Sequence, residues 1–214
     1  MKQKAVVVWN DPWHPSERYA PFIEALLPAD KWEVQTTVHA RELAGLPRAP
    51  QLTVFLACGC EEKEEGLPDE IQQKIVEMVR GGMGILFFHA GLVKIGEESL
   101  FYKELNAGRF ISHPPECAVA VTAVGGVRHP VLEGVALFAG KDEHYFCQLD
   151  VSRTTLLACG TSQHLTAPCA WAHSYGDGRV VSLTPGHTTE VLCNPELLRL
   201  TRNAVEWLAQ PAAL

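Results

Sequence analysis

The stretch GGMGILFFHAGL, residues 81–92, indicates how this chain folds. Residues 84–88 (GILFF) form an apolar run of the length expected for a strand that is buried on both faces. A helix over 67–82 precedes this run, since Pro68 suits a first helical turn and apolar residues recur behind it at helical spacing. The run ends in His89-Ala90-Gly91, so a core strand delivers an imidazole where it leaves the sheet.

The rest of the chain alternates strands and helices in the same way. Strands are expected at 4–9, 32–39, 51–59, 84–88, 116–124 and 154–160, with a hairpin-like pair at 169–187 and helices at 15–27, 67–82 and 194–210. Strands separated by helices of this length imply crossover connections and a parallel sheet with helices on both faces. We therefore predict an α/β fold, a three-layer parallel-sheet sandwich of the flavodoxin-like type, with one domain over residues 1–214.

Composition and charge indicate which classes of partner this protein is expected to bind. The chain has 214 residues and a formal net charge of −7, and its densest charge run, EEKEEG at 61–66, is acidic, which argues against nucleic acid. No apolar run approaches the roughly twenty residues that span a bilayer. The seven cysteines are odd in number and no signal peptide is visible at the start, so we expect a cytoplasmic protein with reduced thiols.

Polar residues follow the ends of four predicted strands. The stretches are residues 9–14 (WNDPWH), 58–61 (CGCE), 89–91 (HAG) and 184–190 (TPGHTTE). Because ligands bind beyond the carboxyl ends of the strands in an open parallel sheet, this pattern indicates a shared site at one edge.

Each histidine at these strand ends also has a structural interpretation. His89 is either a buried ring that holds a loop carbonyl or a site residue, and Gly91 favours the site, because a strand–small residue–glycine turn is typical of a nucleophile elbow. His187 follows Pro185-Gly186 and is either a turn residue or a site residue. His14 lies in a loop with Trp9 and Trp13, which either stack on sugar rings or pack into the core.

Two further groups of residues are weaker candidates for a functional site. Cys58 and Cys60 form a C-x-C pattern, which without a second pair is a poor zinc signature. Asp142 and Glu143 lie beside His144, where the alternative to a carboxylate–imidazole group is a solvated loop.

Several motifs together resemble the ThuA-like (trehalose utilisation protein) family. They are VVVWNDPWHPSE (6–17), GMGILFFHAG (82–91), RFISHP (109–114), DEHY (142–145) and the C-terminal GDGRVVSLTPGH (176–187) with the helix after it. The resemblance implies a fold similar to that of class I glutamine amidotransferases and a role linked to trehalose-related or keto sugars. The nucleophile of those enzymes is a cysteine, whereas this chain has His89 there, so we do not expect glutaminase activity.

We expect an enzyme of carbohydrate metabolism, a hydrolase or isomerase that uses histidines. The candidate catalytic residues are His89, His187 and Glu143; the candidate substrate-binding residues are Trp9, Asn10, Trp13, His14 and His113; and the candidate metal ligands, for a divalent metal such as zinc, are His14, His89 and His187. Metal-free acid–base catalysis by two histidines is the alternative chemistry.

Two other functions stay open at this point: a non-catalytic sugar-binding or assembly subunit, and a cysteine hydrolase that uses Cys58 or Cys60. The expected partner is a small-molecule sugar, with no nucleic acid and no membrane. Whether the chain forms a homo-oligomer is left open.

Overall fold

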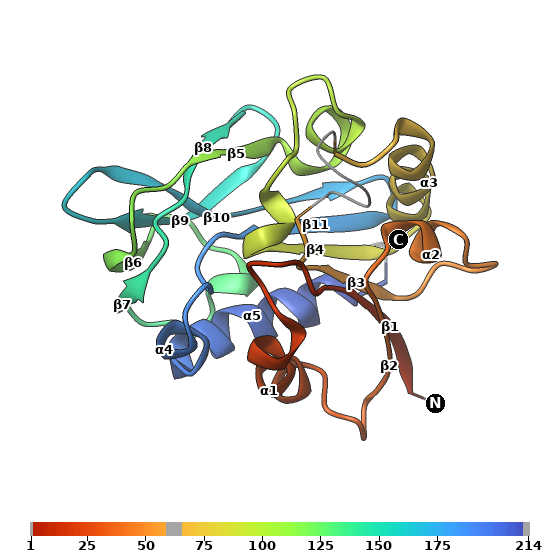
Figure 1. The fold of residues 1–214 in the computed structure, drawn as a ribbon, viewed down its shortest axis with the longest axis horizontal. Helices are drawn as coiled ribbons and strands as arrows, with labels where there is room; N and C mark the ends of the chain where they lie inside the picture. The colour runs from red at the N-terminus through yellow and green to blue at the C-terminus, as the bar shows by residue number, and fades with distance from the viewer. Residues whose placement is uncertain (1, 59–65, 212–214) are drawn as a thin grey trace.

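The computed structural model describes residues 2–58 and 66–211, and a nine-stranded sheet runs through this part of the chain (Figure 1). Its strand order is β2-β1-β3-β4-β11-β10-β9-β6-β7. The first five strands in this order are parallel: β2 (Trp32–Thr37), β1 (Gln3–Val8), β3 (Leu52–Phe55), β4 (Gly84–Phe88) and β11 (Gly178–Leu183). The remaining four pair antiparallel: β10 (Thr166–Tyr175), β9 (Thr155–Thr161), β6 (Cys117–Ala123) and β7 (Phe138–Asp142).

The predicted α/β sandwich is therefore confirmed, with a sheet that is mixed rather than parallel throughout. The change of direction occurs at the predicted hairpin, where β10 and β11 are joined by a tight turn at Gly176 and Asp177. A connection this short can only join antiparallel neighbours, whereas parallel strands need a crossover of a dozen or more residues.

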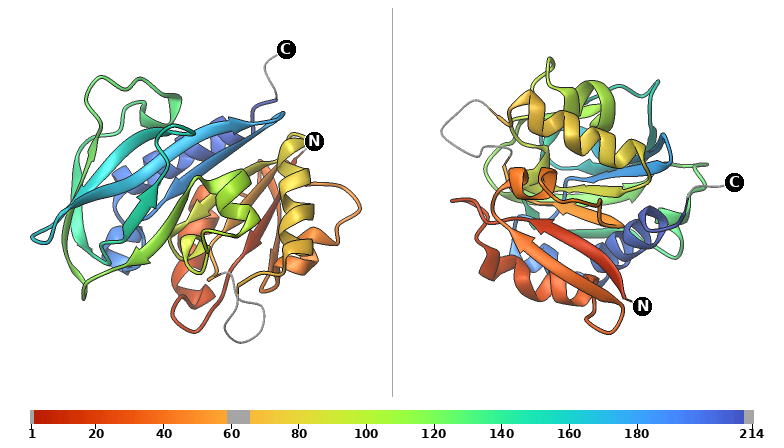
Figure 2. Two further views of the ribbon diagram at one scale, coloured as in Figure 1. Left: turned by 90° about the horizontal axis from the view of Figure 1, so that it is seen from above. Right: turned by 90° about the vertical axis from the view of Figure 1, so that its right-hand side faces the viewer.

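Helices cover both faces of the sheet (Figure 2). One face carries α1 (Ser16–Leu26), α4 (Thr189–Leu192) and α5 (Pro195–Leu208), and the other carries α2 (Ala40–Ala44) and α3 (Asp69–Arg80). The two-stranded ribbon of β5 (Gly108–Ser112) and β8 (Phe146–Leu149) lies on the α3 side, over β10. Short helical turns are formed by His89–Leu92, Phe101–Asn106 and Pro130–Leu132.

Strand β4 shows why the apolar run of the sequence is buried. All five of its residues are buried. Successive strand side chains point to opposite faces, so Phe88 stacks on Phe22 of α1 at 5.2 Å between ring centroids, while Phe87 packs against Phe101 on the other face at 5.5 Å. The strand is therefore covered by hydrocarbon on both sides, as its composition predicts.

Helix boundaries also agree closely with the predicted ones. Helix α3 begins at Asp69, directly after Pro68. Helix α5 begins at Pro195, and the side chain of Asn194 caps it by accepting the backbone N–H of Glu196 at 2.9 Å. The short elements β5, β7, β8, α2 and α4 were not predicted. None of the helices in the described ranges is long and apolar enough to cross a lipid bilayer.

The direction of β7 decides where the site lies. Four antiparallel pairings separate β7 from β11, so β7 runs in the same direction as the parallel strands. The carboxyl ends of β1, β4, β11 and β7 are consequently all at one edge of the sheet. Residues that follow these four strands can therefore meet, which is the usual location of ligands in α/β folds.

Candidate functional site

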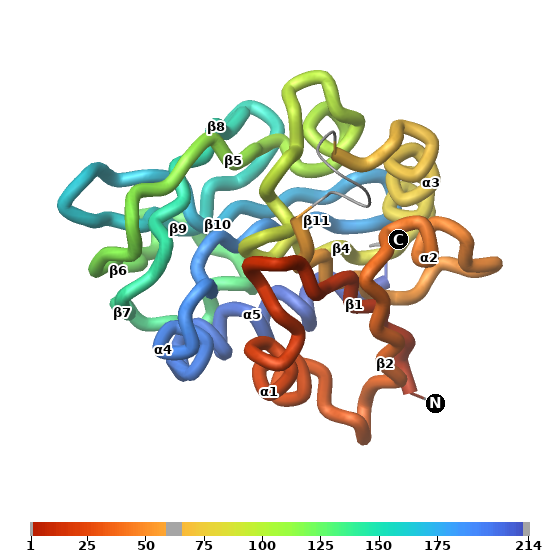
Figure 3. Tube along the Cα trace, in the orientation of Figure 1, coloured from red at the N-terminus to blue at the C-terminus, as the bar shows by residue number. Residues whose placement is uncertain are grey.

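Side chains from four distant segments meet at this edge of the sheet. We call them the histidine–glutamate cluster, and its members are His14 (after β1), His89 (after β4), Glu143 (after β7) and His187 (after β11). One nitrogen or carboxylate oxygen from each lies within 4.8 Å of the others. The loops after β1, β4 and β11 approach one another near the centre of the trace (Figure 3). The structure thus brings together every residue that the sequence suggested as catalytic or metal-binding.

His89 is the most deeply placed member. It is fully buried, has a left-handed φ of 44°, and begins the helical turn His89–Leu92. Its Nδ1–H donates to the carbonyl of Thr184 at 2.7 Å, so the lone pair of the neutral ring is on Nε2. Burial lowers the pKa of His89 to about 4, which keeps this ring neutral at pH 7. The turn is tight because Gly91 lies against Phe55: an added Cβ would be 2.0 Å from the Phe55 carbonyl oxygen.

His14 is oriented by a carboxylate. Its Nδ1–H donates to both oxygens of Asp11, at 2.8 and 3.0 Å. Burial would raise the pKa of Asp11, but this hydrogen bond and the N–H of Cys58 outweigh burial and hold that pKa well below its usual range. The other ring nitrogen of His14, Nε2, is buried and has no hydrogen-bond partner among residues 2–58 and 66–211. The ring centroids of His89 and His187 are 5.0 and 5.3 Å away. A fixed ring therefore presents an unpartnered nitrogen where the cluster forms.

The loop that carries His187 is held by Asp142. The Asp142 carboxylate accepts the backbone N–H groups of Gly186, His187 and Thr188 at 2.8, 2.9 and 3.1 Å. Arg18 adds a second restraint, because its Nη1 donates to the carbonyl of His187 at 3.1 Å. Burial lowers the pKa of His187, and the nearby carboxylate of the cluster opposes that shift.

The carboxylate of Glu143 lies beside the imidazoles of the cluster. Its Oε2 lies 3.2 Å from Nδ1 of His187 and 3.4 Å from Nε2 of His89, and its Oε1 lies 3.7 Å from Nε2 of His113. Burial would raise the pKa of Glu143, but its contacts with the imidazoles of His89, His187 and His113 lower it to about 2. The side chains of His187 and Glu143 are 14% and 15% exposed, so solvent reaches the cluster from their side.

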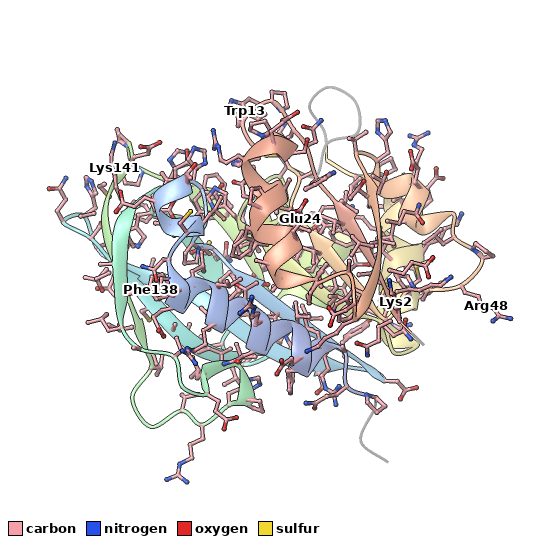
Figure 4. All side chains as sticks on the ribbon, turned by 90° about the horizontal axis from the view of Figure 1, so that it is seen from below. Lys2, Trp13, Glu24, Arg48, Phe138 and Lys141 are labelled. Atoms are coloured by element: carbon pink, nitrogen blue, oxygen red, sulfur yellow. The ribbon has the colours of Figure 1, made fainter. Side chains whose placement is uncertain are left out.

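The predicted substrate-binding residues lie around the cluster in different settings. Trp13 is 60% exposed next to His14, and Figure 4 shows it at the same edge of the molecule as Lys141, next to Asp142 at the end of β7. Trp9 is half-buried and packs against the hydrophobic core. Asn10 is exposed with a left-handed φ of 74°, and its side chain accepts the N–H of Ser16. His113 is exposed at the rim near Glu143.

Two carboxylates lie close to the imidazole of His187 within the described residues. They belong to Glu143 and, with an oxygen 3.9 Å from Nε2, to Glu116. Glu190, three residues after His187, instead accepts the N–H of Lys141 at 3.2 Å. Cys58 is buried and donates its backbone N–H to Asp11. Cys60 lies outside the described residues.

Sequence reasoning missed the residues that hold the cluster in place. Asp11 orients His14, and the three-residue spacing of Asp11 and His14 at a strand exit was an available signal. Arg18 had no such signal, because its partner is a backbone carbonyl 169 residues away. Tyr145 was also missed, although it follows Glu143 by two residues; its ring stacks on that of His89 at 4.3 Å.

Comparison with known proteins identifies the family. Residues 4–208 match the ThuA family model, which is described as trehalose utilisation. This chain belongs to the ThuA family. No curated protein sequence matches it.

Solved structures of ThuA-like proteins share the fold of this ThuA-family chain. The structure from Parabacteroides merdae has a TM-score of 0.75 at 16% identity, covering 98% of this chain and 91% of that one. The structure from Bacteroides uniformis has a TM-score of 0.74 at 18% identity, covering 96% and 91%. A β-galactosidase from Rahnella contains a similar unit, with a TM-score of 0.61 at 13% identity over 97% of this chain and 31% of that one. At these identities the likeness concerns the fold alone.

Proposed function

We propose that this protein is a metal-assisted enzyme of carbohydrate metabolism, a hydrolase or isomerase of trehalose-related or keto sugars that works in the cytoplasm. The observation that carries the proposal is the histidine–glutamate cluster, in which the buried Nε2 of His14 has no hydrogen-bond partner in the described part of the chain. A buried nitrogen without a partner costs about 1–3 kcal/mol, and a cation would supply the missing interaction. The sugar class is supported by the trehalose-utilisation description of the family.

The metal would be held by three imidazoles. His14 and His89 would offer Nε2, and His187 would offer Nδ1, the nitrogen that faces the cluster. Ligating histidines usually donate their other N–H to a carboxylate or a backbone carbonyl, as His14 does to Asp11 and His89 to Thr184. Three histidines with an open position are typical of catalytic zinc sites.

Glu143 would act as the base. When bound, the metal would supply Lewis-acid polarisation of a carbonyl or hydroxyl oxygen of the sugar. Glu143 is ionised at neutral pH and is partly exposed, so its carboxylate can take a proton from the sugar or from a water molecule. Trp13 offers an exposed aromatic face next to His14 on which a sugar ring can stack.

Glutamine hydrolysis is not part of the proposal. The elbow position carries the imidazole of His89 instead of a thiol, so a thioester cannot form there. Cys58 is buried and its backbone N–H donates to Asp11, so Cys58 gives no support to the cysteine-hydrolase alternative.

Metal content tests the proposal directly. Protein purified without a histidine tag should contain about one equivalent of a divalent transition metal by elemental analysis. His89→Ala should lose that metal, because it removes one of three imidazoles from a fully buried position. His164→Ala is the matched control, since His164 is exposed and outside the cluster. Metal-free wild-type protein that takes up no zinc on dialysis would contradict the proposal, as would full retention of the metal in His89→Ala.

A second variant separates catalysis from binding. Glu143→Gln should keep the metal, because the three imidazoles remain, and should lose turnover of keto-disaccharides by at least about 100-fold. Sugar binding without turnover by the metal-loaded wild type would instead favour the non-catalytic sugar-binding subunit.

A further inference from the structure

Tyr145 is a buried residue of the site to which the proposed chemistry gives no role. It lies in the connection between β7 and β8, two residues after Glu143, and is 2% exposed. Its ring contacts the imidazole of His89, with 4.3 Å between centroids and 26° between planes, and the ring of Phe110, with 4.5 Å between centroids. These two aromatic contacts, one from the turn after β4 and one from β5, therefore fix the position of the phenol ring.

The hydroxyl of Tyr145 points at the reactive nitrogen of His89. Oη lies 3.1 Å from Nε2. This contact is a hydrogen bond to the Nε2 lone pair, because Nδ1–H of His89 donates to the carbonyl of Thr184. A metal bound to Nε2 would take that lone pair and leave the hydroxyl without its acceptor.

Within residues 2–58 and 66–211, Nε2 of His89 is the one acceptor that this hydroxyl has. With a metal on Nε2, the donor would therefore need a new acceptor. A phenol is protonated at pH 7, and burial raises the pKa of Tyr145 further, so the group can donate but is no anionic ligand. A buried donor of this kind gains free energy when a ligand brings an oxygen acceptor to it.

We propose that Tyr145 Oη donates a hydrogen bond to the oxygen of the ligand that enters the histidine–glutamate cluster, which makes it a substrate-contacting residue. The inference rests on the proposed function, since the cluster must hold a metal for that oxygen to bind there. The ligand class is a small molecule with a carbonyl or hydroxyl oxygen, such as a keto sugar, that approaches from the exposed side of His187 and Glu143.

The test uses cobalt and a simple oxygen ligand. Protein loaded with Co²⁺ is titrated with acetohydroxamate, and the Kd is read from the visible absorption of the metal. Tyr145→Phe keeps the aromatic stack and removes only the hydroxyl, so it should bind Co²⁺ with an unchanged stoichiometry and spectrum. Its Kd for acetohydroxamate should rise about tenfold, the loss expected for one hydrogen bond to a charged ligand. Tyr102→Phe is the control, because the Tyr102 hydroxyl contacts Gln148 outside the cluster.

The outcomes separate the two proposals. An unchanged Kd in Tyr145→Phe overturns the role of Tyr145 and leaves the metal site intact, whereas wild-type protein that takes up no Co²⁺ overturns the proposed function. If Tyr145→Phe does not fold, 3-fluorotyrosine at position 145 replaces it. This residue is a stronger donor of nearly the same volume, so it should tighten acetohydroxamate binding, and weaker or equal binding contradicts the inference.

Discussion

The parallel and antiparallel halves of the sheet contribute different chemistry to the same site. The parallel half supplies the three imidazoles, each placed just beyond the end of a buried strand. The antiparallel half supplies the carboxylate of Glu143, the phenol of Tyr145 and the Asp142 carboxylate that holds the His187 loop. The comparison shows that residues following the strands of a parallel sheet lie at one edge simply because all these strands run in the same direction. A residue that follows a strand of the antiparallel half joins them only if the number of strand reversals is even, as it is for β7.

The largest effect should come from the parallel half, at the turn after β4. Gly91→Ala would place a Cβ 2.0 Å from the carbonyl oxygen of Phe55, which is backbone within the β3–β4 pair and cannot move aside. We expect the free energy of unfolding to fall by at least about 3 kcal/mol, measured by urea denaturation. Gly96→Ala is the control, since a Cβ there meets open space, and it should change stability by less than about 0.5 kcal/mol. Similar losses in both variants would show that the close contact with Phe55 does not matter.

In the antiparallel half, Asp142→Asn should give the next largest effect. Both carboxylate oxygens accept backbone N–H groups of the 186–188 loop, and an amide would replace one acceptor with a donor that opposes them. We expect a loss of about 2 kcal/mol in the free energy of unfolding and metal binding about tenfold weaker, because His187 is no longer held. Asp30→Asn, on the surface, should leave both quantities unchanged. Unaltered metal affinity in Asp142→Asn would mean that Asp142 does not position His187.

The pH dependence of stability should separate His89, which follows a parallel strand, from Asp142, which ends β7, because burial shifts the pKa values of these two groups in opposite directions. Burial lowers the pKa of His89 from 6.5 to about 4, so between these values the unfolded chain binds more protons at this residue, and its contribution to stability increases with pH. Burial raises the pKa of Asp142 from 3.8 to about 6, so the folded chain binds more protons there, and that contribution decreases as the pH rises through 6.

Each variant should therefore change the slope of stability against pH in the direction set by the group that it removes. In metal-free protein with EDTA, Asp142→Asn should have a more positive slope from pH 4 to pH 6.5 than the wild type. His89→Gln should have a less positive slope than the wild type, while His173, whose pKa burial also lowers to about 4, keeps its own contribution. Urea denaturation at each pH measures both slopes. Parallel pH profiles for all three proteins would contradict these assignments of the pKa shifts.

The smallest effect on stability is expected at the rim. Trp13→Ala removes a side chain that is 60% exposed, so the free energy of unfolding should change by less than about 0.5 kcal/mol. Binding of trehalose or a keto-disaccharide, measured by calorimetry, should weaken about tenfold because the stacking face is gone, and Trp13→Phe should restore most of it. A destabilised Trp13→Ala protein would indicate that Trp13 packs against the fold, and unchanged sugar binding would exclude it from the site.

Much of the parallel half was predictable from the sequence. Buried parallel strands read as short apolar runs, which is why β1, β3 and β4 were found. Helices α3 and α5 were found because proline and capping residues mark where they begin. In the antiparallel half, the strands predicted at 116–124 and 154–160 are confirmed as β6 and β9. The predictions missed β7 (FAGKD) in this half and β8 (FCQL) in the two-stranded ribbon. Both are short and half-exposed, so neither an apolar run nor a regular alternation distinguishes them from loops.

By itself the sequence determined the ThuA family, the α/β class and the three histidines that follow strands, because apolar runs and the residues that end them are local features of the chain. The sequence also indicated Glu143 as a catalytic candidate, but only the tertiary structure decided that it lies among these histidines together with Tyr145. The structure alone decided that Asp11, Arg18 and Asp142 hold the histidines in place. Those contacts depend on strand order and direction across the whole sheet. Both are set by how buried surfaces pack together over long separations in the chain, which no local pattern of residues records.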